Sequence, residues 1–184
     1  MQITDLAIRD LKLVQLTVHG DGRGFFMESY KEADWRAILG ERAFIQDNQS
    51  LSTEAGTLRG LHYQVPPLAQ AKLVQALRGR ILDVAVDLRR DSPSFGRHVA
   101  LELAAGDGRQ MFVPEGFAHG FLTLEPDSMV AYKVTAGYEP NSERGLAWDD
   151  PDLGIAWPVA ARGRMTLSAR DRQWPRLRDL TDLF

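Results

Sequence analysis

The chain has 184 residues, of which 44% are hydrophobic and 26% are charged, a mixture typical of one globular domain and not of a disordered protein. Its 22 Lys and Arg residues stand against 25 Asp and Glu residues, and the formal charge of -3 argues against a dedicated nucleic-acid-binding protein. The absence of cysteine excludes disulfides, thiolate nucleophiles and cysteine-based metal sites.

Short apolar runs separated by turn residues predict a chain built mainly of β-strands. In chain order, the strands are expected at 11–19, 25–30, 72–77, 81–88, 98–103, 110–113, 120–124 and 129–134, with a turn at 20–24. The strands at 72–77 and 81–88 are expected to form a hairpin around Gly79. In the second of these strands Val84 and Val86 alternate with Asp83 and Asp87, which is the pattern of a strand with one buried face.

Helix is scarce in the predicted structure. One helix is expected over 31–39, where Trp35, Ile38 and Leu39 follow helical spacing and Gly40 can cap the end. Many short strands with little helix predict an all-β antiparallel sandwich or barrel, and a jelly roll with a ligand site in its mouth fits the length. No linker or repeat divides the chain, so a single domain over 1–184 is expected.

No apolar stretch is long enough for a signal-peptide core or a membrane span. We therefore expect a cytoplasmic protein without a membrane partner and without a nucleic-acid partner.

Two of the four histidines lie in segments rich in glycine and aromatic residues, His62 in 56–64 and His119 in 114–121. The segment Pro-x-Gly-x-x-His that ends at His119 is similar to half of the metal motif of cupins. The first segment offers only His62, and two imidazoles fall short of the three or four protein ligands of a usual metal site. We therefore expect no metal and a reaction carried by side chains alone. The alternative is that both histidines are hydrogen-bonded structural residues.

Three further residues have both a chemical and a structural interpretation. Lys72 shares a strand face with the apolar residues at 74 and 76, or is a lysine whose stem covers the strand start while its amine reaches water. Tyr132 lies on a face with two valines and is either a proton donor in the barrel or a core tyrosine with a bonded hydroxyl. Asp171 follows Ser168 by three residues, which is also the spacing of a helix capping box.

Taken together, the motifs resemble the dTDP-4-dehydrorhamnose 3,5-epimerase family of cofactor-independent enzymes with a cupin-type jelly roll. The matching segments include Asp21-x-Arg23-Gly24-x-Phe26-x-Glu28-x-Tyr30, Leu58-Arg59-Gly60-Leu61-His62-Tyr63-Gln64, Pro114-x-Gly116-Phe117-Ala118-His119-Gly120-Phe121 and Leu167-Ser168-x-x-Asp171. Others lie at 46–50, 67–74, 83–89, 132–133, 148–151 and 157–158, so the resemblance runs in order along nearly the whole chain.

The resemblance implies that the protein inverts C3 and C5 of dTDP-4-keto-6-deoxy-D-glucose through an enolate, giving dTDP-4-keto-L-rhamnose for dTDP-L-rhamnose biosynthesis. It implies that His62 is the general base, Asp171 its paired carboxylate, Lys72 the cation at the enolate oxygen, and Tyr132 the acid on the opposite sugar face. No metal or redox cofactor is implied. The residues implied to bind the nucleotide and sugar, besides Lys72, are Arg23, Phe26, Glu28, Gln46, Asn48, Arg59, His119, Tyr138, Glu143 and Arg170.

The resemblance also implies a homodimer with exchanged N-terminal strands, in which Arg23 and Glu28 serve the neighbouring subunit's site. Two positions depart from the family: Arg170 stands where lysine is usual, and Gln49 where histidine is usual. An arginine keeps the charge and changes the geometry of its contacts. The alternatives are an epimerase that inverts only C3 or C5, a sugar 3,4-ketoisomerase, and a cupin that binds a nucleotide sugar without turnover. A metal-dependent cupin oxygenase is disfavoured by the missing ligands.

Overall fold

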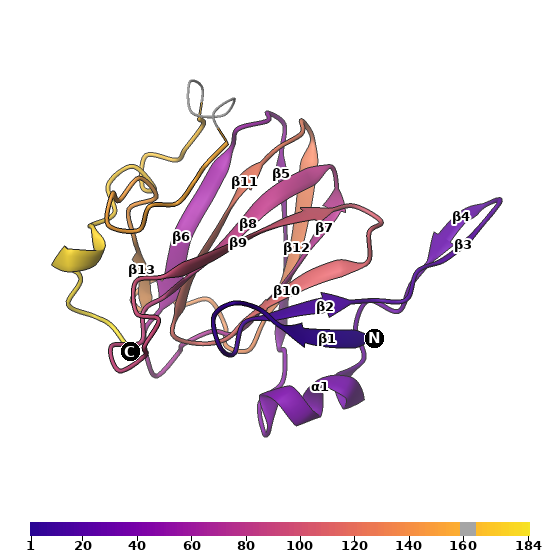
Figure 1. Cartoon of the computed structure of the whole chain (residues 1–184), viewed down its shortest axis with the longest axis horizontal. Helices are drawn as coiled ribbons and strands as arrows, with labels where there is room; N and C mark the ends of the chain where they lie inside the picture. The colour runs from indigo at the N-terminus through magenta and orange to yellow at the C-terminus, as the bar shows by residue number, and fades with distance from the viewer. Residues whose placement is uncertain (159–164) are drawn as a thin grey trace.

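Two antiparallel β-sheets form the body of the computed structural model, which describes residues 1–158 and 165–184 (Figure 1). Within those residues one sheet has six strands in the order β1 (Gln2–Asp5), β2 (Lys12–Gln15), β10 (Arg109–Val113), β7 (Lys72–Arg78), β12 (Ser128–Val134) and β5 (Gln46–Ser52). The other has five, in the order β13 (Glu143–Gly145), β6 (Leu58–Gln64), β11 (Phe117–Thr123), β8 (Arg80–Asp87) and β9 (His98–Ala104). The all-β prediction is confirmed.

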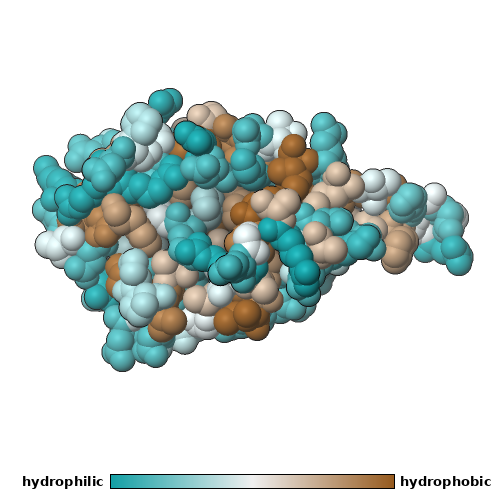
Figure 2. Space-filling model, turned by 90° about the horizontal axis from the view of Figure 1, so that it is seen from below, coloured by the Kyte–Doolittle hydropathy of each residue, from teal (hydrophilic) through white to brown (hydrophobic). Residues whose placement is uncertain are grey.

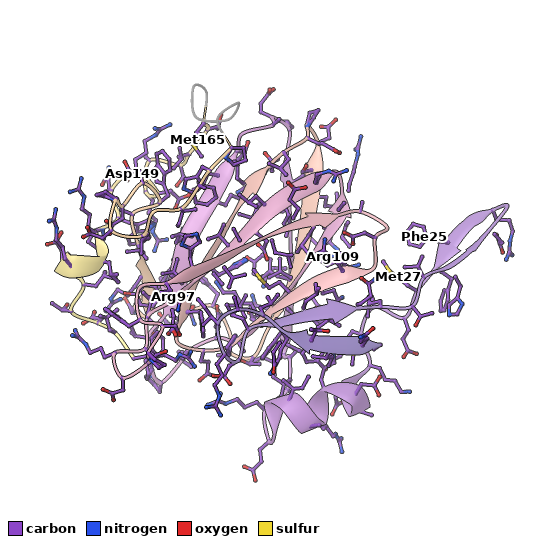
Figure 3. The ribbon with its side chains drawn as sticks, viewed as in Figure 1. Phe25, Met27, Arg97, Arg109, Asp149 and Met165 are labelled. Atoms are coloured by element: carbon purple, nitrogen blue, oxygen red, sulfur yellow. The ribbon has the colours of Figure 1, made fainter. Side chains whose placement is uncertain are left out.

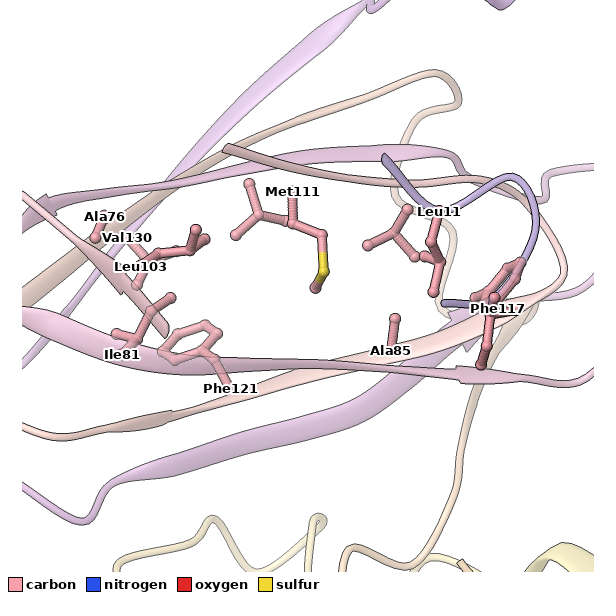
Figure 4. Packing of buried hydrophobic residues seen from close by; sticks show 12 residues of the cluster. Leu11, Ala76, Ile81, Ala85, Leu103, Met111, Phe117, Phe121 and Val130 are labelled. Atoms are coloured by element: carbon pink, nitrogen blue, oxygen red, sulfur yellow. The ribbon is translucent and has the colours of Figure 1, made fainter. Parts of the chain in front are cut away.

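The two sheets face each other across an apolar core. Inward side chains such as Ala76 on β7, Met111 on β10, Ala85 on β8 and Phe121 on β11 are all 4% exposed or less and pack between the sheets (Figure 4). The inward positions are not all apolar, because Lys72 on β7, Asp83 on β8 and His119 on β11 are buried there as well. These residues belong to the candidate site described below.

Both sheets are also covered on part of their outer faces. The chain from Leu146 to Phe184, as far as it is described, packs on the outer face of the five-stranded sheet, against side chains such as Val84 and Val86. Strand β8 is therefore buried on both faces, and the prediction of a single buried face is wrong. Its aspartates, Asp83 and Asp87, point inward and are fully buried.

The predicted helix over 31–39 is confirmed as α1 (Glu32–Leu39), in which Trp35 is buried. Gly40 ends it with a φ of 64°, and its N–H donates to the carbonyl of Arg36 at 2.9 Å. The helix packs with Phe44 and Phe112 against the outer face of the six-stranded sheet.

The hairpin predicted around Gly79 is wrong. β7 and β8 follow one another in the chain but belong to different sheets. Gly79 carries the chain from one sheet to the other with a φ of 70°, a conformation that favours glycine. A Cβ on Gly79 would lie 2.4 Å from the hydroxyl of Ser128, so the corner also requires the missing side chain.

Strands β1, β5, β6 and β13 have no counterpart among the predicted strands, and β11 begins at Phe117, before the predicted start at 120. β5 is composed almost entirely of polar residues and β6 contains Gly60, so neither has the apolar pattern of a strand. The strand predicted at 25–30 is confirmed only at its start, in β4.

A two-stranded hairpin, β3 (His19–Asp21) and β4 (Gly24–Phe26), stands away from the body as a narrow arm (Figures 1 and 2). It occupies the place of the turn predicted at 20–24. Phe25 lies on this arm and Met27 at its base (Figure 3). Phe25 and Phe26 are 57% and 70% exposed. A short η1 helix (Leu177–Asp179) lies near the C-terminus, and no described helix is long and apolar enough to span a membrane.

Candidate active site

Side chains from strands of both sheets and from the turn at 169–172 meet around one cavity. His62 on β6 lies directly opposite His119 on β11 in the strand register, and Tyr132 lies on β12 beside Val74 of β7. A cavity of about 290 Å³ opens there, lined by Ser50, Arg59, His62, Phe121, Tyr132, Ser168, Arg170 and Asp171. The fold thus brings together residues that are far apart in the sequence.

The imidazole of His62 is paired with the carboxylate of Asp171. His62 Nε2 lies 2.6 Å from Asp171 Oδ1, and Asp171 is only 5% exposed. Burial alone would raise the pKa of Asp171, but hydrogen bonds from His62, Ser168 and Trp174 outweigh it and lower that pKa. An ionised carboxylate accepts the Nε2 proton of the neutral imidazole, which leaves the lone pair on Nδ1. His62 is therefore arranged as a base whose tautomer is set by Asp171.

The spacing of Ser168 and Asp171, which is that of a capping box, corresponds to a hydrogen bond in the structure. The backbone N–H of Asp171 donates to Ser168 Oγ at 3.0 Å, in a turn rather than at the start of a helix. This bond holds the backbone while the carboxylate points to His62. The structural and the chemical interpretations of Asp171 thus describe the same local geometry.

Lys72 lies inside the sandwich, 7% exposed, so the alternative in which its amine reaches water is wrong. Its Nζ donates to the backbone carbonyl of His62 at 3.2 Å. Burial lowers the pKa of Lys72 to about 8, and the negative charges of Asp83 and Glu143 oppose that shift. The amine is still mainly protonated at neutral pH, so a cation lies beside the His62 backbone.

His119 and Asp83 form a second buried pair. His119 Nε2 lies 2.7 Å from Asp83 Oδ1, with His119 6% exposed and Asp83 fully buried. Asp83 Oδ2 has no hydrogen-bond partner in the described part of the protein. The sequence analysis did not single out Asp83 as a site residue, because β8 was expected to turn its aspartates to water.

Tyr132 is half-buried on the cavity wall opposite the His62–Asp171 pair. Its hydroxyl makes no hydrogen bond to any residue that the structure describes, so the alternative of a bonded core hydroxyl is wrong. Burial raises the pKa of Tyr132, with Arg59 lowering it and Glu143 raising it. The phenol is therefore protonated at neutral pH and can donate a proton into the cavity.

The rim of the site carries the predicted nucleotide-binding residues of the body. Glu143 Oε2 accepts hydrogen bonds from Tyr138 Oη at 2.7 Å and from Arg170 Nη2 at 2.5 Å. Arg59 is held by Ser52 Oγ and by the carbonyl of Leu51.

Gln46 and Asn48 extend this rim along β5. Gln46 donates to Asn48 Oδ1 at 2.7 Å and accepts from the backbone N–H of Tyr138 at 3.3 Å. Gln49 lines a different cavity, of about 210 Å³, on the outer face of the six-stranded sheet. Nothing in the structure explains the departure at this position.

Of the predicted binding residues, Arg59 and Arg170 line this cavity and the others do not, among them three near the N-terminus. Arg23 and Phe26 lie on the projecting hairpin, and Glu28 follows it at the edge of a separate cavity with Phe26. The guanidinium of Arg23 is paired with Asp21 of the same hairpin.

Trp174 is a second residue that the sequence analysis missed. Its ring lies edge-on to the imidazole of His62, with ring centroids 6.0 Å apart. Among the described residues there is no group of three or more His, Asp or Glu side chains placed to hold a metal ion.

Comparison with known proteins gives a consistent result. The family model for dTDP-4-dehydrorhamnose 3,5-epimerase matches residues 5–179. The chain is 46% identical over 184 residues to the dTDP-4-dehydrorhamnose 3,5-epimerase of Sinorhizobium fredii, covering 100% of this chain and 93% of the relative.

Two solved structures show the same fold. The enzyme of Legionella pneumophila, in complex with dTDP-4-keto-L-rhamnose, aligns with a TM-score of 0.92 and 41% identity, covering 98% of this chain and 94% of that one. A 3'-monoepimerase from Streptomyces bikiniensis, in complex with dTDP-quinovose, aligns with a TM-score of 0.87 and 35% identity, covering 94% and 86%.

Proposed function

This chain belongs to the dTDP-4-dehydrorhamnose 3,5-epimerase family, and we propose that it inverts C3 and C5 of dTDP-4-keto-6-deoxy-D-glucose to give dTDP-4-keto-L-rhamnose. The observation that carries this proposal is the His62–Asp171 pair, which shares one cavity with the protonated phenol of Tyr132. A base and an acid on different walls of a cavity are what inversion of a carbon centre requires.

The C3 and C5 protons of the substrate lie alpha to the C4 ketone, so removal of either leaves an enolate. We assign proton removal to His62 Nδ1, with Asp171 stabilising the imidazolium that forms. The buried ammonium of Lys72 provides positive charge for the developing O4 anion. Tyr132 returns a proton to the opposite face of the sugar ring. In this scheme no metal or redox cofactor takes part.

The rim residues are assigned to the rest of the substrate. Arg59 and Arg170 provide guanidinium groups for the diphosphate, a match of charge and planar geometry. Tyr138 is 54% exposed and offers an aromatic face to the thymine. Gln46, Asn48 and Glu143 are assigned as hydrogen-bonding groups for the nucleotide and sugar, and His119 is assigned to the sugar.

We further propose a homodimer in which the N-terminal strands are exchanged, so that Arg23, Phe26 and Glu28 complete the partner's site. The projecting hairpin supports this, because a lone two-stranded hairpin with exposed phenylalanines is marginally stable in water. A cytoplasmic location, expected from the sequence, is part of the same proposal.

The test is proton NMR of dTDP-4-keto-6-deoxy-D-glucose with the purified, chelator-treated protein in deuterated water. Deuterium at both C3 and C5 without added metal is the expected result. Deuterium at one carbon alone identifies a mono-epimerase, for which the Streptomyces bikiniensis enzyme is a structural precedent. A protein that binds the nucleotide sugar and leaves both protons in place is a binding cupin.

A further inference from the structure

Trp174 contacts both members of the His62–Asp171 pair. Its indole Nε1–H donates to Asp171 Oδ1 at 3.2 Å, and this is the same oxygen that lies 2.6 Å from His62 Nε2. The indole ring also meets the imidazole edge-on, with an interplanar angle of 71°. One carboxylate oxygen is therefore shared by two donors, one of which belongs to the proposed base.

The backbone opposite His62 leaves a slot for this indole. Gly145 pairs with His62 in the register of β13 and β6. A Cβ on Gly145 would lie 2.1 Å from a ring carbon of Trp174, so any side chain at 145 would displace the ring. Gly145 is required here for space, and the glycine and the tryptophan form a complementary pair.

The indole also contacts a residue of the rim, Arg170. The guanidinium carbon of Arg170 lies 4.8 Å from the centroid of the Trp174 ring, while its Nη2 is paired with Glu143. A planar guanidinium stacks on an aromatic face in a way that an ammonium does not. The arginine at 170 and the tryptophan at 174 thus form one unit.

We propose that Trp174 is a positioning residue with two effects on the reaction assigned above. Its N–H weakens the pull of Asp171 on the His62 imidazolium, and its ring holds Arg170 at the mouth for the diphosphate. This inference rests on the proposed epimerase function. It connects the base and the phosphate-binding rim through a single side chain.

The first effect is tested with Trp174→Phe, which keeps an aromatic face and removes the N–H. Without that donor, Asp171 Oδ1 interacts more strongly with the imidazolium, so the pKa of His62 rises. We expect a rise of roughly 0.5 pH unit, a fraction of one charge-assisted hydrogen bond. The rise is measured by NMR titration of the histidine C2 protons, with His62 assigned by its absence in His62→Ala, and by the acidic limb of kcat/KM. An unchanged or lowered His62 pKa refutes the first effect.

The second effect is tested with Trp174→Leu and Arg170→Lys, singly and together. Trp174→Leu should raise KM by roughly three- to fivefold because the stacked guanidinium loses its support, and Arg170→Lys should raise it at least as much because the guanidinium itself is lost. The double variant should be no worse than Arg170→Lys alone, since the tryptophan then has no guanidinium left to support. Additive increases in KM, or an unchanged KM in Trp174→Leu, overturn the second effect.

Trp148→Phe is the matched control, because Trp148 is also a partly buried tryptophan but packs on the outer face of the five-stranded sheet. It should leave the His62 pKa and KM unchanged. The NMR titration needs no turnover, so its result stands even if the wild-type protein exchanges no substrate protons. A wild-type protein that exchanges no substrate protons would refute the epimerase proposal. The titration would still show whether Trp174 acts on His62.

Discussion

Replacement of Lys72 by methionine should make the protein more stable and far less active. Lys72 is buried in the sandwich, and no carboxylate among the described residues lies within ion-pair distance of its amine. Methionine matches the length and shape of the lysine stem and carries no charge. The substitution therefore removes the cost of burying the ammonium while largely preserving the packing.

The magnitude follows from the pKa of Lys72. A fall from 10.5 to about 8 corresponds to about 3 kcal/mol of free energy opposing the charged form in the folded state. The variant also loses the hydrogen bond to the carbonyl of His62, worth about 1 kcal/mol. Lys72→Met should thus be more stable by about 2 kcal/mol at pH 7. Its kcat should fall by about 10²–10³, the usual effect of losing one group that stabilises a developing oxyanion.

The pH dependence of the difference in free energy of unfolding between the wild type and Lys72→Met shows whether the charge of Lys72 causes it. Below about pH 8 the amine is charged in both the folded and the unfolded state, and the full cost is present. Between about pH 8 and 10.5 the folded protein has released the proton and the unfolded chain still holds it, so wild-type stability rises relative to the variant. By about pH 9.5 the two free energies of unfolding should be nearly equal.

Urea unfolding of both proteins at one protein concentration, at pH 7 and pH 9.5, measures this difference. Other titrating groups are common to the two proteins and cancel. A variant that is less stable than the wild type at pH 7 refutes the argument. So does a difference that does not change between the two pH values.

Three further outcomes are expected. His62→Ala should abolish deuterium incorporation at both C3 and C5, and epimerisation at the wild-type rate by this variant would refute the assignment of the base. Tyr132→Phe should keep some exchange while forming little inverted product. Mixing inactive Arg23→Ala and His62→Ala subunits should restore about a quarter of wild-type activity if hairpins are exchanged in a dimer, whereas no recovery would place Arg23 outside the partner's site. The kcat/KM of the wild type should fall above about pH 8, because Lys72 then loses its charge, and a profile flat to pH 10 would contradict its role.

Sequence patterns reveal this fold where one strand face is apolar and fail where pairing depends on distant segments. β7 and β12 were predicted because each contains a short run rich in apolar residues that is bounded by turn residues. β5 was missed because its seven residues are nearly all polar, and it forms through its pairing with β12. The wrong prediction of a hairpin at Gly79 shows the limit of local turn signals. A glycine between two strands gives the same sequence pattern whether the chain returns to the same sheet or crosses to the other sheet.

The site divides in a similar way. The family resemblance led to His62 and Asp171, whose closeness no spacing argument could establish. Asp83 was missed because the valines of β8 pack under the C-terminal segment on the outer face, so that the aspartates turn inward between the sheets. Trp174 was missed because the contacts that place it in the site, to Gly145 and His62, join segments that are distant in the sequence.

The charges in the site suggest why a metal is dispensable in the proposed reaction. Two imidazoles each have a carboxylate partner, at 2.6 Å for His62 and 2.7 Å for His119, whereas the Lys72 ammonium is held by a neutral carbonyl and by more distant charges. An enolate oxygen forming beside Lys72 would meet a cation whose charge is not already neutralised by an ion pair. The unpaired charge of Lys72 both stabilises the enolate oxygen and destabilises the folded protein. A substitution that removes this charge therefore makes the protein more stable and the stabilisation of the enolate weaker.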